Sequence, residues 1–567
     1  MSSPRPVGYA WSVAELLLGP LLRHVDDTCA TVWVETDVAC TVEVLGHSAR
    51  TFHVAGHHYA LVAVRGLPPG SSTAYEVHLD GTAVWPPGGH DFPPSTIRTI
   101  PHRNDTALRL LFGSCHFGGT EDPKKYATLG IDALAAYGRR MAGRAESTWP
   151  DALLLLGDQV YADELTPEVQ RQVSARRALG RPRGPGRPPA DEVADFEEYT
   201  YLYRHSWNEP HLRWMLSTVP TMMIFDDHDV RDDWNISRAW RAHMARLPWW
   251  SERLAGALIS YWLYQHIGNL GPDELERDEL YQQVLQAGRS GDAMPVLREF
   301  AETAEAERGH VKGMRWSYRR DLGPARLIVI DSRAGRILDA HERAMLSEQD
   351  FEWLERGIDT PHEHLLLASS LPWLLPHAIH HAQSWNEAVC RGRGRWARLG
   401  EWLRQLGDLE HWAAFRGSFD RLSRLVAAAA GTRSRTATPA PDTRTAPSTV
   451  CMLSGDVHHS YLAEARYRGA HAPVVQVTCS PVHNAVSHTL RGPLRMAWSP
   501  VLAGCFRLLA RRAGVAPLPV RWSKSAGPYF GNMVGVLDLH GSGAEVRFER
   551  IEDAAGRWST LVSRRLS

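Results

Sequence analysis

The sequence lacks the cysteine pattern of a disulfide-stabilised or zinc-binding protein. Its seven cysteines are odd in number, widely spaced, and include no CxxC pair. Secreted scaffolds usually carry paired cysteines, and zinc sites usually need clustered ones. The pattern does not favour a disulfide framework, and it predicts reduced thiols in a cytoplasmic setting.

Long hydrophobic runs and a recognisable export signal are also missing. No uninterrupted apolar run reaches the ~18 residues that a membrane-spanning helix requires. The N-terminus has one early arginine, and Glu15 interrupts its apolar stretch, so it matches neither a signal peptide nor a twin-arginine leader. We therefore expect a cytoplasmic protein.

The chain has no excess charge of either sign. Lys plus Arg number 63 and Asp plus Glu number 64, which gives a net charge of −1. No bulk field would draw the chain to nucleic acid, so nucleic acid is not expected as a bulk partner. The 44% hydrophobic content, over 567 residues without an internal repeat, is typical of a globular protein with a large core.

The first hundred residues contain short strand patterns separated by turn signals. The segment 31–35 is rich in β-formers, and Tyr75, Val77 and Leu79 alternate with polar neighbours. This pattern predicts a small β-sandwich, of the fibronectin or immunoglobulin kind, over residues 1–100. In it, Tyr75 is either a corner tyrosine hydrogen-bonded to the backbone or a plain core residue.

After residue 105 the pattern changes to short, nearly continuous apolar runs that stop at polar or glycine-rich turns. Such runs are typical of strands buried on both faces, with helices such as 132–141 and 396–406 packed outside. We expect an α/β catalytic domain over 105–550 and a C-terminal tail over 551–567. The runs are Leu108–Phe112, Ala152–Leu156, Met222–Phe225, Leu327–Ile330, Leu365–Ala368, Val450–Leu453 and Val474–Val477.

Polar residues follow these runs, where ligands bind in open α/β sheets. They are Cys115, Asp158, Asp227, Asp331, Ser369, Asp456 and His483. In the segment GDQVYADE, Asp158 comes directly after a strand, and Tyr161 and Asp163 follow. A carboxylate on such a turn can bridge two cations, and a phenolate could join one of them. The alternative is that Asp158 caps the turn and Tyr161 fills the core.

The segment FDDHDVRDDWN places many carboxylates directly after another apolar run. Their mutual repulsion is relieved either by a bound cation or by solvent. With a cation, Asp227 is the ligand and His228 contacts the phosphate or protonates the leaving group. Without one, the segment is an acidic solvated turn.

Three further residues suit metal ligation. Asp456 and His458 alternate in SGDVHHS, so in an extended loop they point the same way, and His459 faces elsewhere to orient a neighbour. Cys115 ends a strand in GSC, where a metal or nearby backbone amides would stabilise its thiolate. Its alternative is an inert buried thiol.

Two arginines in LIVIDSRAGR, Arg333 and Arg336, offer forked donors for phosphate oxygens. Structural ion pairing explains them equally well.

Two segments are expected to be surface loops. They are residues 175–189, which are basic and rich in Pro and Gly, and residues 431–448, which are polar. The functional alternative is that one of them forms an arginine-bearing lid for an anionic substrate.

Taken in order, GSC, GDQVYAD, FDDHDVRDDWN, IDSRAGR, SSLPW and SGDVHHS resemble the alkaline phosphatase D (PhoD-like) family of metallophosphoesterases. The resemblance implies a two-sheet sandwich flanked by helices. It also implies hydrolysis of small-molecule phosphomonoesters or phosphodiesters by a metal-bound hydroxide. The missing export signal departs from secreted members and puts extracellular phosphate scavenging in doubt.

The resemblance also implies two kinds of metal ion, Fe³⁺ and one or more Ca²⁺. Thiolate and phenolate donors suit the first, and clustered carboxylates suit the second. The implied iron ligands are Cys115, Asp158, Tyr161 and His458, and the implied calcium ligands are Asp158, Asp227 and Asp456. The expected catalytic residues are His228, Arg333 and Arg336, with Asp163, Asp229 and His459 supporting the ligands.

Two other functions remain open at this stage. The segment 491–514 mixes arginines with apolar residues and would suit an anionic membrane surface, which favours a phospholipase D type of headgroup hydrolysis. A helix packed on the core with solvated arginines explains the same segment. The other alternative is a non-catalytic binding protein that a metal merely stabilises.

Overall fold

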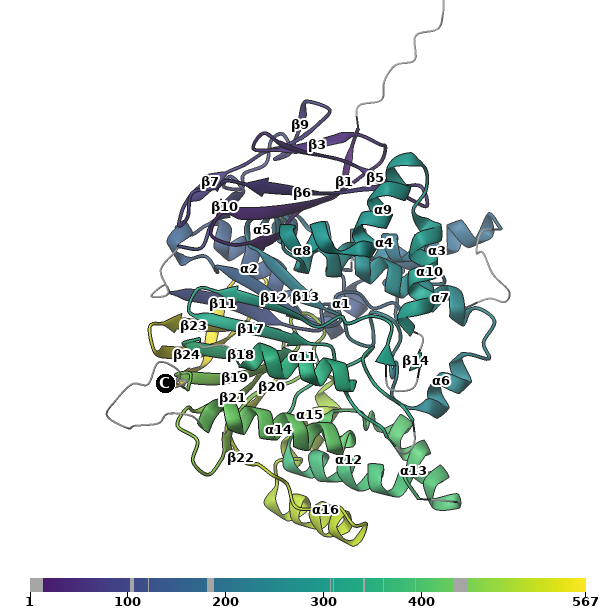
Figure 1. Cartoon of the computed structure of the whole chain (residues 1–567), viewed down its shortest axis with the longest axis vertical. Helices are drawn as coiled ribbons and strands as arrows, with labels where there is room; N and C mark the ends of the chain where they lie inside the picture. The colour runs from purple at the N-terminus through teal and green to yellow at the C-terminus, as the bar shows by residue number, and fades with distance from the viewer. Residues whose placement is uncertain are drawn as a thin grey trace, which may run out of the picture.

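The computed structural model describes residues 14–101, 107–120, 122–180, 188–305, 307–308, 311–339, 342–359, 362–392, 394–431 and 446–567. Within these ranges, a group of short N-terminal strands lies on a larger region of mixed helices and strands (Figure 1).

The N-terminal strands form two four-stranded sheets, ordered β1-β2-β6-β5 and β4-β3-β8-β9, and one two-stranded ladder, β10-β7. Alternation along β2 explains their packing, because Val32 and Val34 lie between the two sheets while Trp33 packs toward the larger region, 5.2 Å from the ring of Tyr264. The strands are β1 (Leu16–Val25), β2 (Cys29–Thr36), β3 (Thr41–Val44), β4 (His47–Arg50), β5 (Phe52–Val54), β6 (His57–Arg65), β7 (Ser72–Ala74), β8 (Val77–Leu79), β9 (Thr82–Trp85) and β10 (Thr96–Arg98).

Tyr75 differs from the expectation. It lies between β7 and β8 rather than in one strand with Val77 and Leu79. Its hydroxyl donates to the carbonyl of Ser217, at 2.6 Å, in the larger region. The hydroxyl is therefore hydrogen-bonded to the backbone, as the corner-tyrosine interpretation expected, but its partner belongs to helix α5 (Pro210–Thr218) and not to the N-terminal strands.

The larger region is an α/β sandwich of a six-stranded and a seven-stranded sheet, which confirms the expected fold class. The six-stranded sheet is β13 (Thr221–Ile224), β12 (Ala152–Leu156), β11 (Leu108–Gly113), β23 (Met533–His540), β24 (Gly543–Ile551) and β25 (Trp558–Arg565). The seven-stranded sheet is β16 (Tyr318–Leu322), β17 (Ala325–Ile330), β18 (His364–Ser369), β19 (Thr449–Ser454), β21 (Val474–Thr478), β20 (Ser460–Arg466) and β22 (Arg521–Tyr529). A short ladder pairs β14 (Glu307–Arg308) with β15 (Val311–Lys312).

All seven apolar runs are strands of these sheets, and burial on both faces explains their continuity. In β17, Leu327 and Val329 face the core shared with the six-stranded sheet, whereas Ile328 and Ile330 face a second core. Helices α11 (Glu348–Ile358) and α14 (Arg416–Gly431) cover that second core (Figure 1). Because both faces are buried, no polar residue interrupts the run from Leu327 to Ile330.

Helices cover the outer faces of both sheets (Figure 1). The expected helices 132–141 and 396–406 correspond to α2, which Asp132 caps, and α13. The α-helices are α1 (Pro123–Leu129), α2 (Ala133–Ala142), α3 (Pro167–Ala178), α4 (Phe196–Trp207), α5 (Pro210–Thr218), α6 (Arg238–Met244), α7 (Trp250–Ser260), α8 (Pro272–Arg277), α9 (Glu279–Ser290), α10 (Met294–Glu305), α11 (Glu348–Ile358), α12 (His377–Cys390), α13 (Arg395–Leu406), α14 (Arg416–Gly431), α15 (His488–Met496) and α16 (Pro500–Arg512).

The sequence predicted a C-terminal tail and two surface loops, and the structure describes these three segments to different extents. Residues 551–567 are not a free tail, because they contain β25, which pairs with β24. The segment 175–189 begins inside α3, where Arg176 and Arg177 pair with Asp195 and Glu198, and 181–187 lie outside the described residues. Most of 431–448 also lies outside them.

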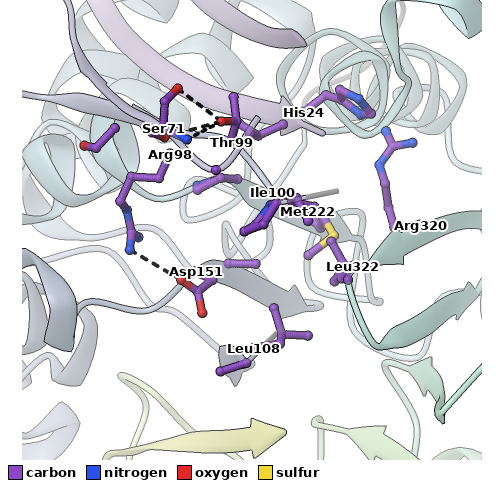
Figure 2. A pocket seen from close by; sticks show the side chains of 18 of the residues that line it. His24, Ser71, Arg98, Thr99, Ile100, Leu108, Asp151, Met222, Arg320 and Leu322 are labelled. Atoms are coloured by element: carbon purple, nitrogen blue, oxygen red, sulfur yellow. Dashed lines mark hydrogen bonds and ion pairs between the residues drawn. The ribbon is translucent and has the colours of Figure 1, made fainter. Parts of the chain in front are cut away.

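A cavity of about 380 Å³ lies between the N-terminal strands and the sandwich (Figure 2). Leu108 and Ala152, the first residues of β11 and β12, line it. It is therefore at the amino ends of these strands, away from the predicted ligand end. No described helix is long and apolar enough to cross a membrane.

Candidate metal centre

Loops that follow β11, β12, β13 and β19 converge at one end of the sandwich. Strands β11, β12 and β13 run parallel, as do β17, β18, β19 and β21, so the carboxyl ends within each set share one edge. Two glycines allow the close approach of the loops. A Cβ on Gly455 would meet the Ser114 side chain at 2.0 Å, and one on Gly157 would meet Asp226 Cβ at 2.5 Å.

Four of the predicted ligands have left-handed backbone conformations. The φ angles of Cys115, Asp158, Asp456 and His458 are 59°, 51°, 66° and 49°. Residues other than glycine rarely adopt such angles, which cost free energy and concentrate at functional sites. The turns bring the ligand atoms of Cys115, Asp158 and His458 within 4.8 Å of one another, so the strained backbone accompanies the gathering of these side chains.

Cys115, Asp158 and His458 form the first cluster, whose ligand atoms all lie within 4.8 Å of one another. The Cys115 Sγ is 3.3 Å from Asp158 Oδ2 and accepts a hydrogen bond from Ser480 Oγ at 3.3 Å. Tyr161 packs alongside, with its ring 4.5 Å from that of His228. Three of the four predicted iron ligands therefore meet at one place, and Tyr161 packs against His228 beside them.

Burial sets the protonation of this cluster in the absence of a cation. Desolvation, reinforced by the charge of Asp456, raises the pKa of the Cys115 thiol to about 12. Desolvation and the nearby Cys115 raise the pKa of Asp158 well above its usual range. Desolvation lowers the pKa of His458 to about 4, which keeps its imidazole neutral. A bound cation would reverse the first two effects, because it stabilises thiolate and carboxylate.

Asp227 joins the first cluster to a second group of carboxylates. Asp158, Asp227 and His228 offer ligand atoms within 4.8 Å of one another, and so do Asp226, Asp227 and Asp456. Asp158 and Asp227 therefore lie between the thiol side and the carboxylate side of the site. This is the arrangement in which a shared carboxylate can bridge two cations.

His228 is held by Asp163, a residue that was predicted to support the metal ligands. The His228 Nδ1 lies 3.0 Å from both carboxylate oxygens of Asp163. Burial lowers the pKa of His228, but the charge and hydrogen bond of Asp163, together with Asp158 and Asp227, raise it well above its ordinary value. The imidazolium is thus favoured, and its ring lines the cavity.

Asp229 ties together the loops after β12 and β13. Its Oδ2 accepts the backbone N–H groups of Asp158 and Asp226, both at 2.9 Å, and its Oδ1 accepts those of Gln159 and Val160 at 3.2 and 3.3 Å. Despite these bonds, burial raises its pKa to about 7. The residue positions the two turns rather than facing the cavity.

The two predicted arginines lie behind the carboxylates and do not line the cavity. Arg333 forms buried ion pairs with Asp226 and Glu410, and its Nη2 lies 3.1 Å from Asp227 Oδ1. Arg336 donates to Glu410, at 3.1 Å, and to backbone carbonyls. This geometry favours the structural ion-pair interpretation over direct contact with a substrate phosphate.

Sequence reasoning missed Glu410 and His411. Glu410 and His411 both line the cavity, and His411 Nε2 lies 2.9 Å from Asp456 Oδ2. Burial alone raises the pKa of Asp456, but His411 and Arg333 outweigh it and hold that pKa below its usual range. Glu410 and His411 follow helix α13 rather than a strand. The expectation that ligands lie directly after strands, called the strand-end rule below, therefore did not point to them.

Three other strand-end residues have structural partners instead. Asp331 accepts the backbone N–H groups of the turn that follows it, and the Ser369 hydroxyl donates to the carbonyl of Leu371. His483 contacts the carbonyls of Phe117 and Gly130. His459, predicted as a supporting residue, has its Nδ1 2.7 Å from the carbonyl of Val457 and lines the cavity.

The donor set fits a pair of cations. Asp158 Oδ1 is buried and has no hydrogen-bond partner among the described residues. An unpaired buried carboxylate oxygen is costly, and a metal ion is a chemically suitable partner for it. A cavity of about 570 Å³, lined by Asp158, Asp227 and Asp456, opens beside it.

A model of the PhoD-like phosphatase family matches residues 130–494. The chain belongs to that family. A separate model, described as a domain of unknown function (DUF7800), matches residues 13–97. No curated protein matches the chain.

Two solved structures are similar to the chain. One, titled "Structure of PhoD", has a TM-score of 0.58 at 11% identity, over 99% of this chain and 94% of that chain. A purple acid phosphatase from yellow lupin (Lupinus luteus) seeds has a TM-score of 0.47 at 12% identity, over 97% of this chain and 74% of that chain. The first likeness shows the shared fold, and the family match supports a phosphatase.

Proposed function

We propose that this PhoD-like protein hydrolyses phosphate esters with two metal ions held at the loop cluster. The observation that carries the proposal is that Cys115, Asp158 and His458 lie within 4.8 Å of one another while Asp158 is shared with Asp227. The proposed iron ligands are Cys115, Asp158, Tyr161 and His458, and the proposed calcium ligands are Asp158, Asp227 and Asp456.

The donor chemistry supports this division. Thiolate, phenolate and imidazole suit Fe³⁺, whereas the carboxylates suit Ca²⁺. When bound, such ions polarise the phosphoryl oxygens and lower the pKa of attacking water. Asp229 accepts backbone hydrogen bonds from the turns that contain Asp158 and Asp226, and His411 holds Asp456.

His228 is the proposed general acid. Its Nδ1 is held by Asp163 and its ring lines the cavity, so Nε2, which lies 3.9 Å from the exposed carboxylate of Asp232, is the nitrogen that would face a substrate. As water oxygen bonds to phosphorus and the ester P–O bond breaks, the His228 proton passes to the leaving alkoxide oxygen. Arg333 contributes indirectly, because its ion pairs fix Asp227 and balance the acidic cluster.

The test assays the purified protein on aryl phosphates, with elemental analysis of the same sample. We expect iron and calcium in the protein, loss of hydrolysis on chelation, and at least ~100-fold loss in Asp158→Ala, since even residues behind the ligands are worth 10–100-fold. Asp91→Ala, at an exposed position, is the matched control. Activity that survives both chelation and Asp158→Ala overturns the proposal. Metal-dependent stability without turnover would instead identify a binding protein.

A further inference from the structure

The cavity beside the metal centre has two chemically different halves. Asp158, Asp227, Asp456 and His458 line one half. Helices α12, α15 and α16, together with the residue two positions before α12, line the other with apolar side chains, namely Leu375, Ile379, Ala382, Leu494, Leu502 and Phe506. These six residues are called the apolar wall below. A phosphate ion would engage only the first half.

Two of the helices that build the apolar wall pack on each other. Helix α16 lies against α12 (Figure 1). Leu502 and Phe506 are four residues apart on α16, so they lie on the same helical face, and both are only partly buried. On the same helix, Leu508 does not line the cavity and is 50% exposed. The apolar surface toward the site is therefore a feature of one face.

Apolar surface that remains open next to carboxylates is typical of a ligand pocket. Protein interiors close-pack their apolar side chains, whereas ligand cavities of ~300–1,000 Å³ combine an apolar lining with a few polar groups. This cavity, at about 570 Å³, joins the apolar wall directly to the proposed phosphate position. Whatever fills it must be polar at one end and apolar at the other.

We propose that the apolar wall receives an apolar organic group of the substrate, so that the enzyme prefers phosphate esters bearing an alkyl or aryl group of several carbons. The inference rests on the proposed function and adds its substrate class. Contact with the wall removes apolar surface from water, and the resulting binding free energy grows with the length of the group.

The experiment uses p-nitrophenyl phosphodiesters whose second ester group is methyl, butyl or hexyl. The leaving group is the same throughout, so differences in kcat/KM report contact with the second group. We expect kcat/KM to rise with chain length, by up to about fourfold per methylene for full burial. A protein that hydrolyses the methyl ester with no gain for butyl or hexyl overturns the inference and leaves the proposed function intact. If the metal-containing protein hydrolyses aryl phosphates but none of these diesters, the inference is overturned and the proposed function stands. If it hydrolyses neither the aryl phosphates nor the diesters, the proposed function fails, and the inference fails with it.

A matched pair of variants on α16 assigns the effect to the apolar wall. Leu502→Ser places a hydroxyl in the wall, and Leu508→Ser makes the same change on the exposed side. We expect Leu502→Ser to flatten the dependence on chain length and Leu508→Ser to retain it. Equal slopes in the two variants contradict the assignment. Leu494→Ser on α15 gives an independent test if Leu502→Ser folds poorly.

The apolar group could belong to a soluble amphiphile or to a lipid. A second arm therefore presents phosphatidylglycerol in detergent micelles beside the soluble hexyl ester. Hydrolysis of both supports the apolar wall with a lipid source, and hydrolysis of the soluble ester alone supports it with a free amphiphile. Hydrolysis of neither, while the methyl ester is turned over, overturns it.

Discussion

Asp163 shows how one residue can control the chemistry without touching the substrate. It holds His228 Nδ1 at 3.0 Å and accepts the backbone N–H of Asp232 at 2.6 Å. It therefore fixes both the direction of the imidazole and its positive charge. The cavity-facing Nε2 is then the only ring nitrogen available for proton transfer.

Asp163→Asn should lower kcat about 10–100-fold, the range for residues that orient catalytic or metal-binding groups. The amide retains the shape but not the charge that favours the imidazolium. Steady-state kinetics with metal analysis measures this, and the metal content should stay unchanged. Asp232→Asn is the control, because its carboxylate is 63% exposed and 3.9 Å from His228 Nε2. A loss as large in Asp232→Asn would contradict the special role of Asp163.

At the scale of elements, the site depends on how closely the β11 and β19 loops approach each other. Gly455 has no room for a methyl group beside Ser114, and Asp456 follows directly. The Asp456 backbone N–H donates to Ser114 Oγ at 3.0 Å, which ties the two sheets at the metal centre. Separating these loops would move Cys115 away from its partners.

Gly455→Ala should therefore destabilise the protein by about 1–3 kcal/mol, as overpacking does, and reduce its bound metal. Gly504→Ala is the matched control, because it lies in α16 with no atom within 4 Å of the added methyl group. Alanine at that helical position should be neutral or stabilising, by about 0.5–1 kcal/mol. Thermal unfolding and elemental analysis test both variants. Equal melting temperatures and equal metal contents would show that the loop contact is not tight.

The same loops show what the sequence could and could not predict. The seven apolar runs located the buried strands, because two-sided burial removes polar residues from a strand. The strand-end rule then found Cys115, Asp158 and Asp456. It missed Glu410 and His411, which come from a helix–helix connection. It also could not tell whether Arg333 binds substrate or carboxylates, because that depends on which loops meet in three dimensions.

At the scale of the whole molecule, a buried ionic cluster joins the N-terminal strands to the sandwich. His57 of β6 lies 3.1 Å from Glu35 of β2 and 2.8 Å from Glu197 of α4. Arg204 of α4 pairs with Glu35 at 2.8 Å and lies 2.9 Å from His57 Nδ1. Burial lowers the pKa of His57, but Glu197 and Glu35 outweigh it and raise that pKa to about 9.

The His57 pKa in the folded protein lies above the ~6.5 of an unfolded chain, so folding favours the protonated ring. Its stabilisation, of order 3 kcal/mol, is complete below about pH 6.5 and is lost as the pH rises through about 9. His57→Gln should therefore lower the melting temperature most at low pH and flatten its decline between these values. His58→Gln is the control, since this neighbour is only partly buried and its pKa is lowered. If wild type and His57→Gln lose stability in parallel across this range, the cluster does not govern how the N-terminal strands are held.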